Sequence, residues 1–476
     1  MGSTMQIPEK VRYILDQLKR KQYEGYAVGG CVRDSILGRV PGDWDITTSA
    51  KPDEVKKIFR KTVDTGIAHG TVTVIIGGEG FEVTTYRVDG TYEDHRHPDK
   101  VEFTPNLEED LKRRDFTINA MAYSPDQGIV DLFDGMGDIR RKCIKCVGNP
   151  VERFSEDALR MLRGVRFAGQ LGFDIEEDTL RAIGELSPTI ENVSAERIRV
   201  ELTKLLLSKE PEKLILAQKT GLCDVFLPEF SEMLQTEQNN PNHCYDVGTH
   251  SLYAVRHIQQ IYNRMMDMEQ NDKFLSPYGK EYSEEKVNTI LVFSALLHDV
   301  GKPDCYTEDQ EGIGHFYGHD ARGSEMAHAI LRRLKFDNDT VNMVTRIIRF
   351  HERRYEGSRK ALRKLVSKAG ADIMPYLFMV QEADILSQSD YGREAKLQRL
   401  EEARGMYRDI MRAGEAVSIK ELAVTGRDII SLGIEPGPEV GKILNDLLEI
   451  VIEEPQKNNS NLLLTEAQKH ITIKGK

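Results

Sequence analysis

Residues 25–48, GYAVGGCVRDSILGRVPGDWDITT, constrain the fold more than any other stretch of the chain. The apolar run 26–28 is typical of a short strand, and Gly29 and Gly30 follow it directly. A strand that ends in two glycines predicts a strand-to-helix turn, where backbone N–H groups can approach a phosphate. Further β-branched runs, in GTVTVIIGG, GFEVTTYRVDG and KVEFTP, predict that about the first 135 residues form an α/β unit.

Two acidic residues, Asp43 and Asp45, flank Trp44, the only tryptophan of the chain. In an extended strand residues i and i+2 point to the same face, so the two carboxylates should converge while Trp44 faces the other side. Paired carboxylates suit Mg²⁺ and can hold the metal ions of an in-line phosphoryl displacement. Such a pair also occurs by chance, but its position after the glycine turn and Arg33 favours a metal site.

The composition excludes several classes of protein. The chain has 476 residues and a formal net charge of −12, which argues against indiscriminate nucleic-acid binding, although basic clusters occur at 112–114, 140–145 and 160–166. No run of about 18 apolar residues predicts a membrane span. The N-terminus lacks the pattern of a secretory signal, and six cysteines are too few for a disulfide scaffold. We therefore expect a cytoplasmic protein without a membrane role.

The chain resembles the nucleotidyltransferase head of the polymerase-beta superfamily, and more closely the class II tRNA nucleotidyltransferase and bacterial poly(A) polymerase family. Besides GGCVRDSILG and DWDITTSA, the matching motifs are EEDLKRRDFTINAMAY (108–123), DLFDGMGDI (131–139), EDALRMLRGVRF (156–167) and ENVSAERIRVELTKLL (191–206). The resemblance implies that Asp43 and Asp45 bind catalytic Mg²⁺, that Gly30 and Arg33 contact the nucleotide, and that Arg114 reaches its phosphates or ribose.

The motif EDALRMLR contains the residues expected to select the base. At i and i+3 on one helix, Asp157 and Arg160 would share a face, where an acceptor and a guanidinium could pair with cytosine or adenine. Arg163 and Arg166 continue this stripe and are expected near the triphosphate or the RNA. For an isolated helix a solvated basic face would be the better interpretation, but the neighbouring motifs favour nucleotide binding. Arg197 has a weaker case, since it could simply brace the helices.

The resemblance implies transfer of nucleoside monophosphates from CTP and ATP to the 3′ end of tRNA, with the CCA end as product. The segment DGTYEDHRHPDKVEFTPNLEEDL resembles the family's flexible loop, which favours CCA addition or A-only addition over CC addition. The alternatives are an A-adding enzyme or a poly(A) polymerase. An alternative of another class is a catalytically inactive RNA-binding protein. No obligate protein partner is evident.

A second group of residues, rich in histidine, lies between 250 and 384. Histidines and aspartates on separate helices can surround one divalent transition metal. Their order resembles the HD metal-dependent phosphohydrolase domain, which implies one metal, a transition metal or Mg²⁺, at His250, His298, Asp299 and Asp384, and a second at His319 and His351. Hydrolysis of 2′,3′-cyclic phosphates or phosphate monoesters would follow; an HD fold retained for packing or RNA support is the alternative. His243, His257, His315 and His328 fit no ligand position and are interpreted as surface or core residues.

The predicted fold class is an α+β head, with a polymerase-beta-like nucleotidyltransferase sheet and helices, followed by an all-α body that includes an HD domain. We expect the head at 1–148 and a helical neck that selects nucleotides and binds RNA at 149–240. The HD domain should span 241–392, and a helical tail that binds the tRNA body should span 393–476.

Overall fold

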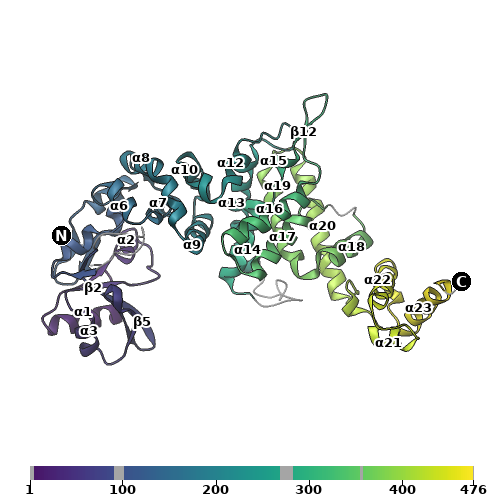
Figure 1. The fold of residues 1–476 in the computed structure, drawn as a ribbon, viewed down its shortest axis with the longest axis horizontal. Coiled ribbons are helices and arrows are strands. Elements are labelled where there is room, and N and C mark those ends of the chain that lie inside the picture. Colours follow the sequence, from purple (N-terminus) through teal and green to yellow (C-terminus); the bar gives the residue numbers. More distant parts are fainter. Residues whose placement is uncertain (1–4, 90–100, 269–281, 354–356, 475–476) are drawn as a thin grey trace. The chain divides into compact units, whose positions relative to one another are not determined.

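The computed structural model describes residues 5–89, 101–268, 282–353 and 357–474 (Figure 1). The segment predicted as the flexible loop therefore lies partly outside the described residues. The chain forms two compact units, 1–228 and 229–476. The first contains a mixed sheet followed by helices and the second is almost wholly helical, which confirms the predicted fold class.

A seven-stranded sheet organises the first unit, in the order β3-β4-β5-β2-β1-β8-β9. Its neighbouring strands are antiparallel except for β2 and β5, which run parallel with Ile46 opposite Val83. The strands are β1 (Gly25–Val28), β2 (Ile46–Thr48), β3 (Thr62–Gly66), β4 (Thr71–Ile76), β5 (Glu79–Thr85), β8 (Met121–Ser124) and β9 (Gly128–Asp131). A separate two-stranded pair, β6 (Arg87–Asp89) and β7 (Val101–Phe103), flanks residues 90–100.

The core of the sheet forms because apolar side chains recur at helical spacing in α1 (Glu9–Arg20) and at alternate positions in the strands. Val11, Ile14 and Leu18 of α1 are fully buried against Val72 and Val83. α3 (Pro52–Ile58) adds Val55 to the same cluster. This hydrophobic cluster also includes Ile46, so it holds the start of the interior strand β2, which the acidic residues directly precede.

Helix α4 (Leu107–Lys112) precedes the last two strands of the sheet, and the helices that follow the sheet are mostly short. The principal ones are α5 (Gly135–Arg141), α6 (Pro150–Glu156), α7 (Leu159–Leu171), α8 (Glu177–Leu186) and α9 (Ala195–Leu206). α7 packs directly against α9, with Leu162 and Val165 fully buried on α7 and Leu202 and Leu205 on α9. Helix α10 (Leu214–Lys219) and helix α11 (Leu222–Phe226) complete the unit.

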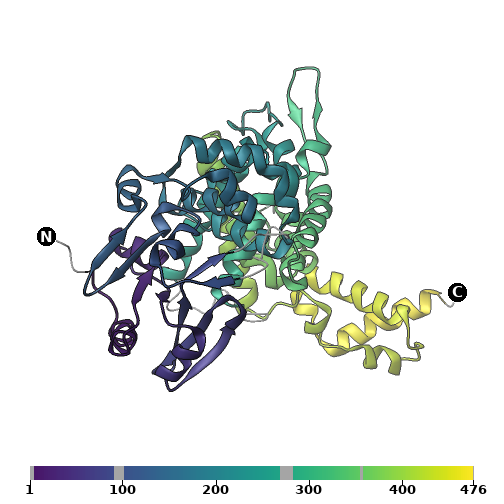
Figure 2. The ribbon, with the colours of Figure 1, turned by 60° about the vertical axis from the view of Figure 1, so that its left-hand side comes forward.

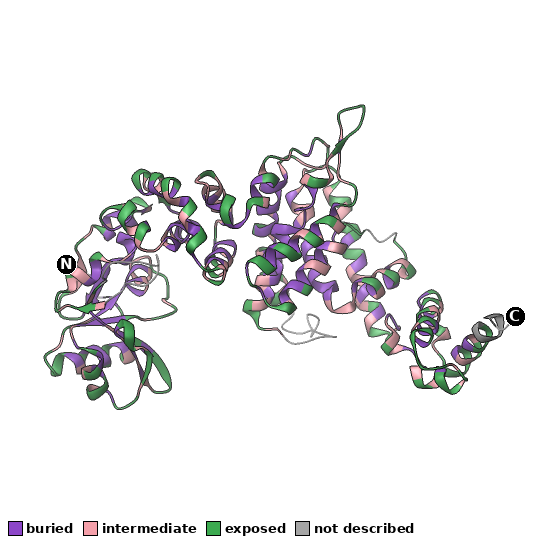
Figure 3. Cartoon of the chain, in the orientation of Figure 1, coloured by how far each residue is buried: buried purple, intermediate pink, exposed green. Residues whose placement is uncertain are grey.

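A helical bundle forms the centre of the second unit. α13 (Val247–Met268) packs against α14 (Glu284–Leu297) and α19 (Met374–Ser387), and α17 (Asn338–Phe350) packs against α14 and α16 (His319–Arg333). Residues 290–300 are all buried, as expected for the apolar run ILVFSALL at the middle of a bundle (Figure 3). A small hairpin of β12 (Thr307–Glu308) and β13 (Gly314–His315) extends beyond the helices (Figure 2).

The C-terminal helices have a hydrophobic cluster of their own. α21 (Gly426–Ser431), α22 (Pro438–Glu453) and α23 (Ser460–Lys474) share it. α18 (Arg359–Ala369) and α20 (Arg393–Arg412) join them to the bundle, and Arg363 Nε donates to the carbonyl of Ile452 at 2.8 Å. Within the described residues, no helix combines the length and apolar character that crossing a bilayer requires.

Candidate active site and metal centre

The glycine turn and the acidic pair lie side by side. β1 ends at Val28, whose N–H donates to the carbonyl of Asp45 at 3.0 Å, and Gly29 then turns the chain into α2 (Gly30–Ile36). Asp43 and Asp45 are exposed, while Trp44 packs against the hydrophobic cluster under the sheet. The pair directly precedes β2 instead of lying within a strand, and the register of β2 with β1 begins at Ile46 opposite Ala27.

A third carboxylate, that of Glu82, lies beside the acidic pair and is not among the site residues predicted from the sequence. The parallel register that places Ile46 opposite Val83 brings the preceding residues, Asp45 and Glu82, next to one another. Although both side chains keep exposed surface, partial desolvation by the surrounding protein raises the pKa of Glu82, and Asp45 and Asp43 raise it further. Desolvation likewise raises the pKa of Asp45, while Arg114 acts to lower it and Asp43 to raise it. Three converging oxygen ligands that destabilise one another's charge fit a divalent cation such as Mg²⁺.

Two arginines lie close to the glycine turn. Arg33 on α2 donates to both carboxylate oxygens of Asp34, at 2.9 and 3.0 Å, and to Asn119 Oδ1 at 2.6 Å. Gly29 has φ +82°, and a Cβ there would stand 2.9 Å from Arg114 Nη1. Arg114 Nε is buried and makes no hydrogen bond within the described residues. Arg114 therefore presents cationic hydrogen-bond donors beside the turn.

A cavity of about 250 Å³ opens next to Arg114 and is dominated by arginine. Its lining consists of Arg113, Arg114, Asp115, Asp157, Leu159, Arg160, Arg163 and Arg197. The structure thus brings together five predicted or considered residues from three separate motifs. The excess of guanidinium groups suits an anionic ligand, and the two carboxylates offer hydrogen-bond acceptors.

The prediction that Asp157 and Arg160 share one helix is wrong. α6 ends at Glu156, Asp157 is extended with φ −146° and ψ 103°, and α7 begins at Leu159. The Asp157 carboxylate accepts from the N–H of Leu159 at 3.1 Å, so it caps the start of α7 instead of lying on its face. Asp and Asn favour such positions because their side chains compete for backbone donors. The two residues still line one cavity.

The arginine stripe on α7 divides between the cavity and the core. Arg160 Nη1 donates to Glu156 Oε2 at 2.6 Å, and Arg163 donates to Asp115 Oδ2 at 2.7 and 2.9 Å. Arg166 is not among the lining residues. Its guanidinium is buried, bonds to Glu201 and lies 3.7 Å from the centre of the Phe167 ring.

The second unit brings all six predicted HD residues to one place. His250 comes from α13, His298 and Asp299 from the end of α14, His319 and His351 from α16 and α17, and Asp384 from α19. His250, His298 and Asp299 form one group of ligand atoms, and Asp299, His319 and His351 form another. Asp299 thus contributes to both groups.

The hydrogen bonds of the histidines determine which ring nitrogen faces inward. Nδ1 of each of the four histidines lies 2.7 to 3.2 Å from a backbone carbonyl, those of Ser387, Ala295, Phe316 and Ile348. A carbonyl only accepts, so Nδ1 carries the proton and the Nε2 lone pair is left for a metal. His250 Nε2 lies 3.2 Å from His298 Nε2, an arrangement that favours a cation.

The charged groups at the histidine centre also fit a metal site. Asp299 Oδ2 is buried, forms an ion pair with Lys302 Nζ at 2.6 Å and lies 3.2 Å from His298 Nε2. Burial opposes protonation of His298, but Asp299 and Asp384 raise its pKa to about 10. Because the two carboxylates favour a positive charge at His298, a divalent metal can take the place of the proton there.

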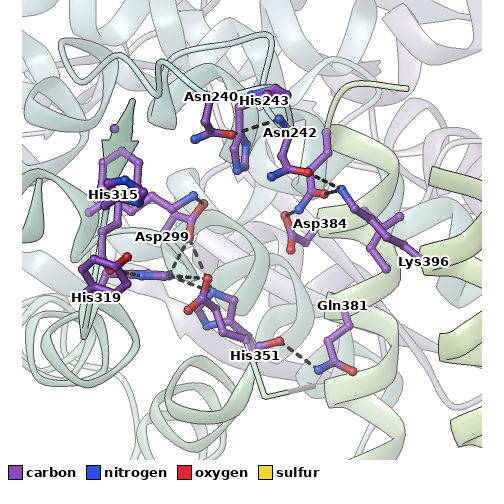
Figure 4. A pocket seen from close by; sticks show the side chains of 18 of the residues that line it. Asn240, Asn242, His243, Asp299, His315, His319, His351, Gln381, Asp384 and Lys396 are labelled. Carbon is purple, nitrogen blue, oxygen red and sulfur yellow. Dashed lines mark hydrogen bonds and ion pairs between the residues drawn. The ribbon is translucent and has the colours of Figure 1, made fainter. Parts of the chain in front are cut away.

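A pocket of about 540 Å³ adjoins this centre (Figure 4). Its lining includes His243 and His315, both interpreted from the sequence as surface or core residues. His243 packs edge-on against His250, with ring centres 5.0 Å apart, and His315 lines the opposite wall. Burial and Lys302 lower the pKa of His243 to about 3. No spacing rule in the sequence links His243 to the centre, because the connection before α13 has no helical periodicity.

Four family models match parts of the chain. Residues 25–145 match the poly(A) polymerase head domain, residues 172–234 the RNA- and SrmB-binding site of polymerase A, residues 243–389 the HD domain and residues 320–467 domain 2 of tRNA nucleotidyltransferases.

Relatives cover almost the whole chain. A CCA-adding enzyme of Limosilactobacillus reuteri is 36% identical over 472 residues, covering 98% of each chain. The structure of the Bacillus stearothermophilus CCA-adding enzyme in complex with CTP is similar with a TM-score of 0.68 and 28% identity, covering 100% of this chain and 99% of that one. The Thermotoga maritima CCA-adding enzyme complexed with tRNA has a TM-score of 0.57 at 19% identity, covers 98% of this chain and 96% of that one, and shares the fold.

Proposed function

Because the chain belongs to the CCA-adding enzyme family of class II tRNA nucleotidyltransferases, with an internal HD domain, we propose that it adds CMP, CMP and AMP to the 3′ end of tRNA. The family makes the protein a nucleotidyltransferase. CTP and ATP would be its substrates, as the CTP complex of the Bacillus relative suggests.

The position of Arg114 is the observation that carries this proposal. Arg114 adjoins Gly29 in the turn beside the acidic pair, and it also lines the arginine-rich cavity. One bound nucleotide could therefore place its triphosphate at the turn and its base in the cavity. Asp157 and Arg160 would then read the base without a nucleic-acid template.

The carboxylates Asp43, Asp45 and Glu82 would hold Mg²⁺, which supplies charge for activating the tRNA hydroxyl and holding the triphosphate. The 3′ hydroxyl would lose its proton to water, and its oxygen would attack the α-phosphorus to form a new P–O bond. The bond between the α-phosphorus and the α,β-bridging oxygen would break, and pyrophosphate would leave with that oxygen. Arg33 and Arg114 would orient the phosphates. Arg33 is itself held by Asp34 and Asn119, so its guanidinium is already oriented.

Incubation with tRNA that lacks its CCA end tests the proposal. CTP alone should extend the tRNA by C residues, and addition of ATP should complete the CCA end. Extension by ATP but not CTP would instead identify an A-adding enzyme, and long A tails a poly(A) polymerase. Tight tRNA binding without any extension would favour the inactive RNA-binding protein.

We further infer that the HD domain is a metal-dependent phosphohydrolase acting on 2′,3′-cyclic phosphates or phosphate monoesters. The inward lone pairs of four histidines, with Asp299 common to both groups, support two divalent transition metals or Mg²⁺. Metals bound there supply a water activated for attack on phosphorus. Opening of 2′,3′-cyclic AMP to AMP and release of phosphate from 2′-AMP, each compared between wild type and Asp299→Asn, test this inference.

The remaining expectations stay proposals. The helices after residue 393 would bind the tRNA body. Because tRNA is the proposed acceptor, we also propose a cytoplasmic location. Six free cysteines, three of them buried, are compatible with that compartment. The domain boundaries at 148, 240 and 392 also stay predictions.

A further inference from the structure

The pocket beside the histidine centre has a wall that lies outside the matched HD segment. The HD model ends at residue 389, but Lys396, Arg399 and Leu400 of α20 line the pocket. Figure 4 shows Lys396 and Asp384 on one side of the pocket and His315 and His319 on the other. The pocket is therefore completed by the segment that follows the HD domain.

Lys396 is held close to the metal ligands by two amide side chains. Its Nζ donates to Gln388 Oε1 at 2.7 Å and to Asn242 Oδ1 at 3.0 Å. Gln388 Nε2 in turn donates to Asp384 Oδ1 at 3.0 Å, so a single side chain separates the ammonium group from a candidate ligand. The two amide oxygens hold the ammonium group in place at the pocket wall. A phosphate at the centre would meet this cation.

The opposite wall offers a flat aromatic surface. The rings of His315 and Tyr317 are stacked, with centres 5.4 Å apart and an angle of 9° between their planes. His315 is held by Asp309, at 2.8 Å from its Nε2, whereas 80% of Tyr317 is exposed. An exposed ring that is already oriented by its neighbour suits stacking against a nucleic-acid base, which is tolerant of sequence.

We propose that this pocket binds a nucleoside phosphate ester, with Lys396 as the phosphate-binding residue and Tyr317 as the platform for the base. The inference rests on the proposed phosphohydrolase function but names two residues that are not metal ligands, Tyr317 within the matched HD segment and Lys396 beyond it. A volume of about 540 Å³ accommodates one nucleotide, within the usual range for small-molecule sites. The ammonium group of Lys396 would bind the phosphate, the neighbouring amide side chains the ribose, and the Tyr317 ring on the facing wall the base.

Calorimetric titration of the full chain, dialysed against Mn²⁺, with inorganic phosphate and with 2′-AMP tests both assignments. Because 2′-AMP could also enter the nucleotidyltransferase site, binding that persists in Asp299→Asn is subtracted. Only the remaining binding is assigned to the pocket. Lys396→Met should weaken binding of both ligands by about tenfold, since a charge-assisted hydrogen bond is lost. Tyr317→Ala should weaken 2′-AMP by at least about fivefold and leave phosphate unchanged. Lys442→Met and Tyr391→Ala, both exposed and outside the pocket, are the matched controls.

Unchanged phosphate affinity in Lys396→Met would overturn the first assignment, as would loss of bound Mn²⁺, which would show that Lys396 acts through Asp384. Equal weakening of both ligands in Tyr317→Ala, or of neither, would overturn the second. Binding with this pattern but no phosphate release from 2′-AMP would reject the hydrolase function and leave the pocket assignment standing.

Discussion

Arg197 holds both carboxylate oxygens of Asp157, with Nη1 3.2 Å from Oδ1 and Nη2 2.7 Å from Oδ2. The N–H of Leu159 occupies a further acceptor position on Oδ1. A carboxylate has about four such positions, so one remains on Oδ2 for a base donor. Cytosine and adenine present an amino group at the corresponding edge, whereas uracil and guanine present a carbonyl oxygen. Arg197 therefore fixes the orientation of a residue expected to distinguish the bases.

Replacing Arg197 by Ala should reduce discrimination against UTP by about tenfold, the effect of roughly 1.4 kcal/mol. The measurement is the ratio of kcat/KM for CTP to that for UTP on tRNA that lacks CCA. Arg181→Ala removes an exposed arginine paired with Glu177 and Asp178, and serves as the control. An equal loss with all nucleotides would show that Arg197 only braces the helices.

Glu82→Gln should lower CMP incorporation by at least about a hundredfold, because one carboxylate of the proposed Mg²⁺ site becomes neutral. Asp45→Asn should be at least as severe. Glu79→Gln on the same strand removes a carboxylate that pairs with Lys10 at the surface, and it should leave the rate unchanged. Near-normal incorporation by Glu82→Gln would exclude it from the metal site.

Gly29→Ala should abolish most nucleotide addition and destabilise the chain by about 1–3 kcal/mol. At φ +82° and ψ −127° the backbone occupies a region that residues with a Cβ rarely adopt, and the new methyl group would displace Arg114. Gly78→Ala, also at positive φ but with open space around it, separates the backbone effect from the displacement. Equal activity losses in the two variants would argue against a special role of the turn.

Asp299→Asn should remove all metal from the HD centre, whereas His250→Ala and His351→Ala should each remove only part of it. The reason is that Asp299 belongs to both groups of ligands while each histidine belongs to one. Metal content per chain, measured by mass spectrometry after dialysis, checks this prediction. His328→Ala, exposed on α16, is the control. A variant Asp299→Asn with full metal content would contradict the shared-ligand arrangement.

Asp115 should stabilise the first unit at neutral pH and lose this effect in acid. Burial acts to raise the pKa of Asp115, but Arg163 and Asn119 outweigh it and hold the pKa well below its usual range. A depressed folded-state pKa contributes stability above the unfolded value of about 3.9, and the contribution is lost as the pH falls below it.

The advantage of wild type over Asp115→Asn in free energy of unfolding should therefore be constant above about pH 5 and shrink by up to about 1.4 kcal/mol per pH unit below about pH 4. Urea unfolding followed by the fluorescence of Trp44, the only tryptophan, reports on this unit. A difference that does not change between pH 6 and pH 3 would contradict the pairing with Arg163.

Much of the fold could be predicted because its signals are local. The glycine turn, the helix at the N-terminus and the helical character after residue 150 depend on spacing within single elements, and each is found as predicted. The prediction for Asp157 failed for a local reason as well, since the carboxylate caps α7 and thereby interrupts the helix. Arg166 follows the predicted period but turns toward Glu201, because α9 packs on that face.

The chemical groups can be identified from the residues alone: two acids after a glycine turn, arginines on a helix, and histidines and aspartates in the order of an HD domain. Which of these groups meet depends on how the elements pack. Glu82 reaches Asp45 through the register of two parallel strands, Asp299 is shared because four helices converge on it, and Lys396 bonds to Asn242, 154 residues earlier in the chain. These contacts join residues far apart in the chain, and their register depends on packing that no single element encodes.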